Sequence, residues 1–161
     1  MRPRVYLETT VVSYLTARPT RRAIAAAHQQ ISKLWWERRR QDFELVVSEL
    51  VLKESAAGAP DAAKRRLALL QEVPILALPD AAEPLVRALI QGRALPVLAA
   101  QDAFHLAVCA LHGVPYLLTW NCAHLANAER FPAIVEVLEA RGLTPPVICT
   151  PEELMGDFNE H

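Results

Sequence analysis

The sequence of 161 residues contains only five glycines, and no two of them lie close together. A dinucleotide-binding fingerprint requires the pattern G-x-G-x-x-G, and a phosphate-binding P-loop requires G-x-x-x-x-G-K followed by serine or threonine. Neither pattern can be written here, because the glycines stand alone at positions 58, 92, 113, 142 and 156. The scarcity of glycine therefore argues against both kinds of nucleotide-binding domain.

Cysteine is also scarce, and its spacing is not that of a metal or disulfide site. The three residues, Cys109, Cys122 and Cys149, form no C-x-x-C pair and are odd in number. Disulfide frameworks of small secreted proteins usually have an even number of cysteines, and zinc knuckles have cysteines paired as C-x-x-C. We interpret these cysteines as buried or unused thiols.

The chain has neither a charge excess nor a long hydrophobic run. The net charge is -1 and the isoelectric point is near 6.5, so the domain as a whole lacks the basic character of many nucleic-acid binders. No apolar run approaches the roughly 18 to 20 residues that a membrane span requires. With 52% hydrophobic and 22% charged residues, we expect a globular cytoplasmic protein with no membrane segment.

Short apolar segments alternate with helical patterns along the chain. Their length and composition predict strands from Val5 to Glu8 and at 43–48, 74–78, 116–120 and 147–149. Apolar spacings of three and four, with capping signals, predict helices at about 20–40, 49–58, 60–72, from 79, at 96–111 and 129–141, and a last turn after Thr150. Nearly apolar strands that alternate with helices are typical of a parallel sheet covered on both faces. We therefore predict an α/β fold, a three-layer α/β/α sandwich with a central parallel five-stranded sheet, in a single domain of residues 1–161.

Acidic and amide side chains occur where this fold brings the chain to one edge of the sheet. Glu8 ends the first strand, and Glu54 lies about two turns into the helix after the second strand, on the same face as Leu50 and Val51. In an open parallel sheet, ligands bind outside the carboxyl ends of the strands, near the point where the strand order reverses. We expect Glu8 and Glu54 to lie near that point.

Two more candidates come from the second half of the chain. Asp102 interrupts a helix whose neighbouring residues, Leu98, Ala99, Leu106 and Val108, are expected in the core. Asn121 ends the fourth strand, where it is equally well explained as a turn residue. Together with Glu8 and Glu54, these residues give four separated segments that each bring one carboxylate or amide to the same edge.

Several converging carboxylates require arginine partners, raised pKa values or a metal ion. A metal explains all of them at once. The ligands offered by Glu8, Glu54 and Asp102 are oxygens, with no cysteine or histidine at zinc spacing, and this ligand set suits Mg²⁺ or Mn²⁺. These ions bind phosphate oxygens, which suits hydrolysis of a phosphodiester.

The segments YLETT, VSELVLKES, QDAFHLA and LLTWNCAHL, in this order, resemble the PIN-domain family, in particular the toxins of VapBC-type toxin–antitoxin pairs. The resemblance covers essentially the whole chain. It implies a five-stranded parallel α/β/α fold and a ribonuclease that depends on Mg²⁺ or Mn²⁺. It also implies a cognate antitoxin as a partner and a homodimer.

The same resemblance assigns roles to individual residues. Glu8 matches the first acid of the family, Glu54 the second and Asp102 the third, and Asn121 matches a position at which members have Asp or Asn. Thr10 matches a small residue that supports the first acid. The usual first acid is Asp, so Glu8 is longer by one methylene.

Other polar residues near these acids have two interpretations each. His124 could contact phosphate or an active-site water, and His105 is better explained as a hydrogen-bonded structural histidine than as a substrate contact. Arg18, with the nearby Arg21 and Arg22, could bind RNA phosphates or could be a solvated helix start. The function that we predict is a metal-dependent ribonuclease, and the alternative is a catalytically silent PIN-like protein that acts only within a complex.

Overall fold

The computed structural model describes residues 1–157 and has one five-stranded sheet at its centre. The strand order is β3-β2-β1-β4-β5, and every pair of neighbours is parallel. The strands are β1 (Arg4–Leu7), β2 (Glu44–Ser48), β3 (Ile75–Leu76), β4 (Tyr116–Leu118) and β5 (Val147–Cys149). The five predicted strands and their parallel arrangement are therefore confirmed.

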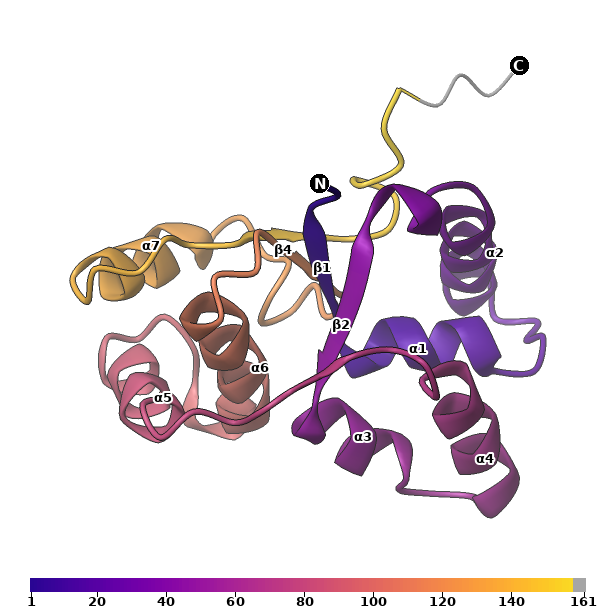
Figure 1. Ribbon diagram of the computed structural model, residues 1–161, viewed down its shortest axis with the longest axis horizontal. Coiled ribbons are helices and arrows are strands. Elements are labelled where there is room, and N and C mark those ends of the chain that lie inside the picture. Colours follow the sequence, from indigo (N-terminus) through magenta and orange to yellow (C-terminus); the bar gives the residue numbers. More distant parts are fainter. Residues whose placement is uncertain (158–161) are drawn as a thin grey trace.

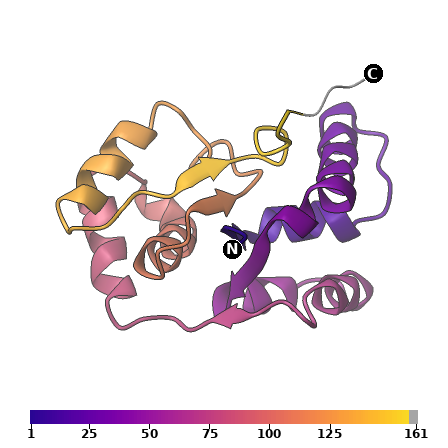
Figure 2. The same ribbon diagram turned by 45° about the horizontal axis from the view of Figure 1, so that its top comes forward.

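Helices cover the sheet on both sides (Figure 1). One group consists of α1 (Thr9–Thr16), α2 (Ala23–Arg38), α3 (Glu49–Ser55) and α4 (Pro60–Leu69), and the other of α5 (Ala82–Gln91), α6 (Ala100–Leu111) and α7 (Phe131–Glu139). The view in Figure 2 shows the same two groups separated by the strands. Short 3₁₀ helices at Arg40–Asp42 (η1) and Val97–Ala99 (η2) precede β2 and α6. The result is the predicted three-layer arrangement.

The strand order reverses beside β1, and this reversal determines where a site can form. The chain runs from β1 to β2 and β3 in one direction across the sheet, and then crosses to β4 and β5 on the other side of β1. Tyr6 of β1 lies between Val46 of β2 and Leu117 of β4. The carboxyl ends of β1 and β4 thus frame the position at which doubly wound sheets bind ligands.

Several helices begin or end at a residue of the type that is common at that position, serine at the start and glycine after the end. Ser48 accepts a hydrogen bond from the backbone N–H of Leu50 at the start of α3 (3.2 Å). Gly113 and Gly142 follow α6 and α7 with φ values of +65° and +71°, a conformation in which glycine has no steric penalty. These features produce the short connections that lead into β4 and β5.

The structure differs from the prediction in the segment that follows β1. Thr9–Thr16 forms α1, whereas the first predicted helix begins only at about residue 20. Glu8 replaces the usual small capping residue, because its side chain accepts from the N–H of Thr10. Val11 and Val12 are fully buried, so packing of α1 against the sheet outweighs the low helix propensity of β-branched residues.

Two smaller predictions need correction. Leu98 was expected in the core but is 97% exposed, because the segment before α6 forms η2 and turns this side chain outward. The capping box at Thr150 forms, since Thr150 and Glu153 exchange hydrogen bonds, but the residues after Thr150 form turns instead of a helix. The predicted domain of residues 1–161 includes 158–161, which lie outside the described residues.

The core lies along both faces of the central strands. Val5, Tyr6 and Leu7 of β1 and Leu117 and Leu118 of β4 are completely buried.

Within residues 1–157, no helix combines the length and apolar character that crossing a membrane requires.

The three thiols should differ in reactivity. Burial raises the pKa of all three thiols, that of Cys149 to about 12, but Cys122 is exposed to reagents whereas Cys109 and Cys149 are buried. The thiolate is the nucleophile, so we expect iodoacetamide to alkylate Cys122 in the native protein and all three thiols in urea. Mass spectrometry of the two reactions would test this, and rapid modification of Cys109 or Cys149 in the native protein would contradict it.

Candidate metal centre

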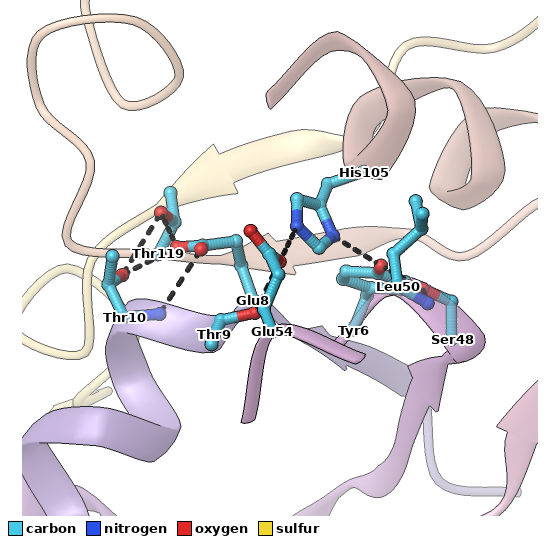
Figure 3. A network of polar contacts seen from close by, with 9 residues as sticks. All are labelled: Tyr6, Glu8, Thr9, Thr10, Ser48, Leu50, Glu54, His105 and Thr119. Atoms are coloured by element: carbon cyan, nitrogen blue, oxygen red, sulfur yellow. Dashed lines mark hydrogen bonds and ion pairs between the residues drawn. The ribbon is translucent and has the colours of Figure 1, made fainter. Parts of the chain in front are cut away.

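Glu8 is the innermost acid of the site. It follows β1 directly, its side chain is only 3% exposed, and its backbone N–H bonds to the carbonyl of Leu118 on β4 (3.0 Å). Its carboxylate accepts hydrogen bonds from Thr10 Oγ1 (2.5 Å) and Thr119 Oγ1 (2.6 Å) at Oε1, and from the N–H of Thr10 at Oε2 (3.1 Å) (Figure 3). All of these donors are neutral groups.

The two threonine hydroxyls have little freedom in how they donate. Thr10 Oγ1 accepts from the N–H of Trp120 (2.9 Å), and Thr119 Oγ1 accepts from the N–H of Asn121 (2.9 Å). With a backbone N–H bound to each oxygen, the single hydroxyl proton of each threonine is directed at Glu8. The loop after β4 and the first turn of α1 therefore jointly hold this carboxylate.

Glu54 reaches the same place from α3. It is 30% exposed, and its Oε1 accepts from Thr9 Oγ1 (2.7 Å) and from His105 Nε2 (2.5 Å). Partial burial opposes ionisation of Glu54, but the hydrogen bonds that it accepts from His105 and Thr9 outweigh this effect, so the pKa of Glu54 lies below its usual value. Glu54 is therefore ionised at neutral pH.

Glu8, Glu54 and His105 form a group that could hold a metal ion. Each offers one ligand atom, and these atoms all lie within 4.8 Å of one another. His105 is 1% exposed and has both ring nitrogens engaged, Nδ1 with Tyr6 Oη (2.6 Å) and Nε2 with Glu54. This is the hydrogen-bonded role that the sequence favoured for His105. It leaves carboxylate oxygens as the free donors, and this donor set fits Mg²⁺ or Mn²⁺.

Asp102, the third predicted metal ligand, lies one turn before His105 on α6 but is not a member of this group. Its side chain is 23% exposed, and its Oδ2 contacts His124 Nδ1 at 3.1 Å. The structure thus places Asp102 and His124 together. The third member of the group is His105, and Asp102 lies one turn away from it on α6 with His124 as its own partner.

Asn121 lies where the sequence placed it, in the loop after β4. Its Oδ1 accepts from the N–H of His124 (3.0 Å), and its carbonyl accepts from the N–H groups of Leu125 and Ala126. The side chain therefore closes a turn, which was one of its two interpretations. That turn brings His124 to Asp102.

Arg18 lies apart from the acids. It is exposed in the loop between α1 and α2, and its carbonyl accepts from Gln29 Nε2 (2.8 Å). The eight residues of α1 separate this loop from Glu8, which is roughly 12 Å along the helix axis. A phosphate bound by Arg18 would therefore not be the one beside Glu8.

Several residues of the site were not predicted from the sequence. Thr119 and Thr9 donate to the two acids, and Tyr6 bonds to His105 and to Ser48 Oγ (2.6 Å). A signal existed for Tyr6, because a tyrosine inside an apolar strand needs a partner for its hydroxyl. For Thr119 there was none, since threonine is common within strands.

Comparison with known proteins identifies the family to which the chain belongs. The family model of the PIN domain matches residues 5–129. The chain belongs to the PIN-domain family. This PIN domain is also similar to a chain in the crystal structure of VapBC2 from Rickettsia felis bound to a DNA fragment from their promoter, with a TM-score of 0.58 and 13% identity over 91% of this chain and 98% of that chain. At this identity the likeness shows the fold. No curated protein matches the chain significantly.

Removal of one donor to Glu8 should destabilise the protein measurably. Thr119→Val keeps the side-chain shape but removes the bond to a buried carboxylate and the acceptor of the Asn121 N–H. We expect the free energy of unfolding in urea, with EDTA present, to fall by about 1.5 to 3 kcal/mol. The matched control is Thr16→Val, whose hydroxyl donates only to the carbonyl of Val12 in its own helix. Equal losses in both variants would contradict the role given to Thr119.

Proposed function

We propose that this PIN domain is an endoribonuclease that depends on Mg²⁺ or Mn²⁺ and hydrolyses RNA phosphodiesters. The observation that carries the proposal is the buried Glu8 carboxylate, which neutral donors surround and which lies within reach of the ionised Glu54. Two carboxylates this close repel each other unless a cation lies between them. The position at the strand reversal and the membership of the family support the same conclusion.

Glu8 and Glu54 would hold the cation from β1 and α3, and Asp102 would add a third carboxylate from α6. A bound Mg²⁺ or Mn²⁺ would neutralise charge on the scissile phosphate and lower the pKa of a water molecule. Thr10 and Thr119 keep Glu8 in place, and Thr9 does the same for Glu54. His124, which is 32% exposed beside Asp102, is placed to contact the phosphate or a water. Asn121 takes part by holding the turn that carries His124.

RNA would extend from this site across the loop between α1 and α2. Arg18, Arg21 and Arg22 are exposed in this loop, and arginine is a common phosphate ligand. The distance along α1 assigns them to phosphates away from the cleaved one.

We further propose that the protein is the toxin of a toxin–antitoxin pair, with a cognate antitoxin as its partner. Support comes from the similarity to a chain of the VapBC2 complex from Rickettsia felis, which has DNA from its promoter bound. In keeping with that role, the protein would act as a homodimer in the cytoplasm, with residues 1–161 as a single domain.

The alternative is a catalytically silent PIN domain that acts only within a complex. Two contacts favour it, because the amide of Asn121 is engaged in a turn and the carboxylate of Asp102 is engaged by His124. Binding of Mn²⁺ without cleavage of structured or single-stranded RNA would support this alternative.

Cleavage of RNA by the purified protein should require the metal and the acids. We expect cleavage with Mg²⁺ or Mn²⁺ and none in EDTA. Glu8→Gln and Asp102→Asn remove charge with little change in shape, and each should lower the rate about 100-fold or more, which corresponds to roughly 3 kcal/mol. The rates are measured on labelled RNA resolved by gel electrophoresis.

The control for these variants is Glu83→Gln. Glu83 forms a surface ion pair with Arg87 on α5 (3.0 Å), so its loss should leave the rate unchanged. Cleavage that persists at the same rate in Asp102→Asn and in EDTA would contradict the proposed function and indicate a contaminating nuclease.

A further inference from the structure

A chain of buried polar groups lies behind the metal centre, on the side of α6. Tyr6 is completely buried on β1, two residues before Glu8, and its hydroxyl bonds to Ser48 Oγ and to His105 Nδ1, each at 2.6 Å (Figure 3). A tyrosine hydroxyl carries its proton at neutral pH, so it can donate one hydrogen bond and accept another. His105 continues the chain to Glu54. Tyr6 and Ser48 are thus two and three hydrogen bonds away from Glu54.

The hydrogen bonds of this chain run in one direction. Ser48 Oγ accepts from the N–H of Leu50, so its own proton is free to go to Tyr6 Oη. Tyr6 can then donate to His105 Nδ1, which leaves the imidazole proton on Nε2, facing the carboxylate of Glu54. Every proton in the chain has an acceptor in this arrangement.

We propose that Tyr6, oriented by Ser48, selects the His105 tautomer that donates to Glu54 Oε1, and that this bond turns Oε2 of Glu54 towards a divalent cation. Tyr6 and His105 are thus positioning residues for a metal ligand. The proposal rests on the metal site of the proposed function, but it does not depend on the substrate.

The contacts of Glu54 explain why the tautomer matters. Thr9 Oγ1 and His105 Nε2 both donate to Oε1, which leaves Oε2 for the cation. In the opposite tautomer, the Nε2 lone pair would face an anionic oxygen, and the carboxylate would rotate away from it. Partners that orient metal ligands in this way typically change metal affinity 10- to 100-fold when they are removed.

The test compares two tyrosine variants of the full chain. Tyr6→Phe removes only the hydroxyl that reaches His105. The matched control is Tyr14→Phe, because the half-buried Tyr14 also packs by its ring, edge-on to His28 and Trp120. Affinity for Mn²⁺ alone is measured by electron paramagnetic resonance. We expect Tyr6→Phe to weaken Mn²⁺ binding about 10-fold, and Tyr14→Phe to leave it unchanged.

A spectroscopic measurement identifies the cause. Imidazole ¹⁵N shifts distinguish protonated from unprotonated ring nitrogens, and the His105 signals are assigned by their loss in His105→Gln. In the metal-free wild-type protein we expect His105 to be protonated at Nε2 and to accept at Nδ1. In Tyr6→Phe, part of the population should move the proton to Nδ1.

A double variant separates positioning from a general structural effect. The amide of His105→Gln carries N–H donors whether or not Tyr6 has a hydroxyl, so adding Tyr6→Phe to it should change the Mn²⁺ dissociation constant by less than about 2-fold. An equal loss in both backgrounds would overturn the proposal, because Tyr6 would then act without His105. So would an unchanged affinity or an unchanged His105 spectrum in Tyr6→Phe.

These outcomes are distinct from failure of the proposed function. A protein that binds Mn²⁺ with the expected loss in Tyr6→Phe, yet cleaves no RNA, supports the positioning chain and contradicts the nuclease. A wild-type protein that binds no Mn²⁺ overturns both.

Discussion

A carboxylate buried without a cation beside it is costly, and the site is organised around this constraint at Glu8. Two threonine hydroxyls and one backbone N–H replace the water that the carboxylate loses. Glu8 is also the cap of α1, so its charge lies at the positive end of a helix. These groups hold the charge but do not neutralise it. A cation shared with Glu54 would complete the balance.

The two acids are held by separate sets of hydrogen bonds. Glu8 depends on the first turn of α1 and on the loop after β4, whereas Glu54 depends on Thr9 and on the buried chain from Ser48 through Tyr6 to His105. Thr9 and Thr10 are neighbours in sequence and serve different acids. The start of α1 therefore ties the two halves of the site together, and a small shift of this helix would change both carboxylates.

Much of this could be predicted from the sequence, because strand and helix patterns alternate clearly and acids at strand ends converge in a parallel sheet. Glu8 and Glu54 were placed correctly at that edge. The helix α1 was missed because β-branched residues occupy its first turn and a glutamate caps it, so its stability comes from tertiary packing of Val11 and Val12.

The details of α6 could not be predicted for another reason. Asp102 and His105 lie one turn apart, and the rotation of the helix decides which of them meets Glu54. Sequence periodicity predicts which face of a helix is buried, but not the exact rotation of that helix about its axis. The predicted helix also began too early, because Leu98, expected on its buried face, lies before α6 and is exposed. Thr119 could not be predicted because its role depends on a partner more than 100 residues away.

That separation has a consequence for how the protein folds. The bond between Thr119 and Glu8 joins residues that are 111 positions apart. Six α-helices and the strands β2 and β3 lie between β1 and β4 along the chain, so β1 acquires β4 as a neighbour only after these have been made. Contacts of such high order form late in folding. During synthesis, which proceeds from the N-terminus, Glu8 is made early but receives its second hydroxyl only when about three quarters of the chain has left the ribosome. Any activity at this site thus begins only near the end of translation.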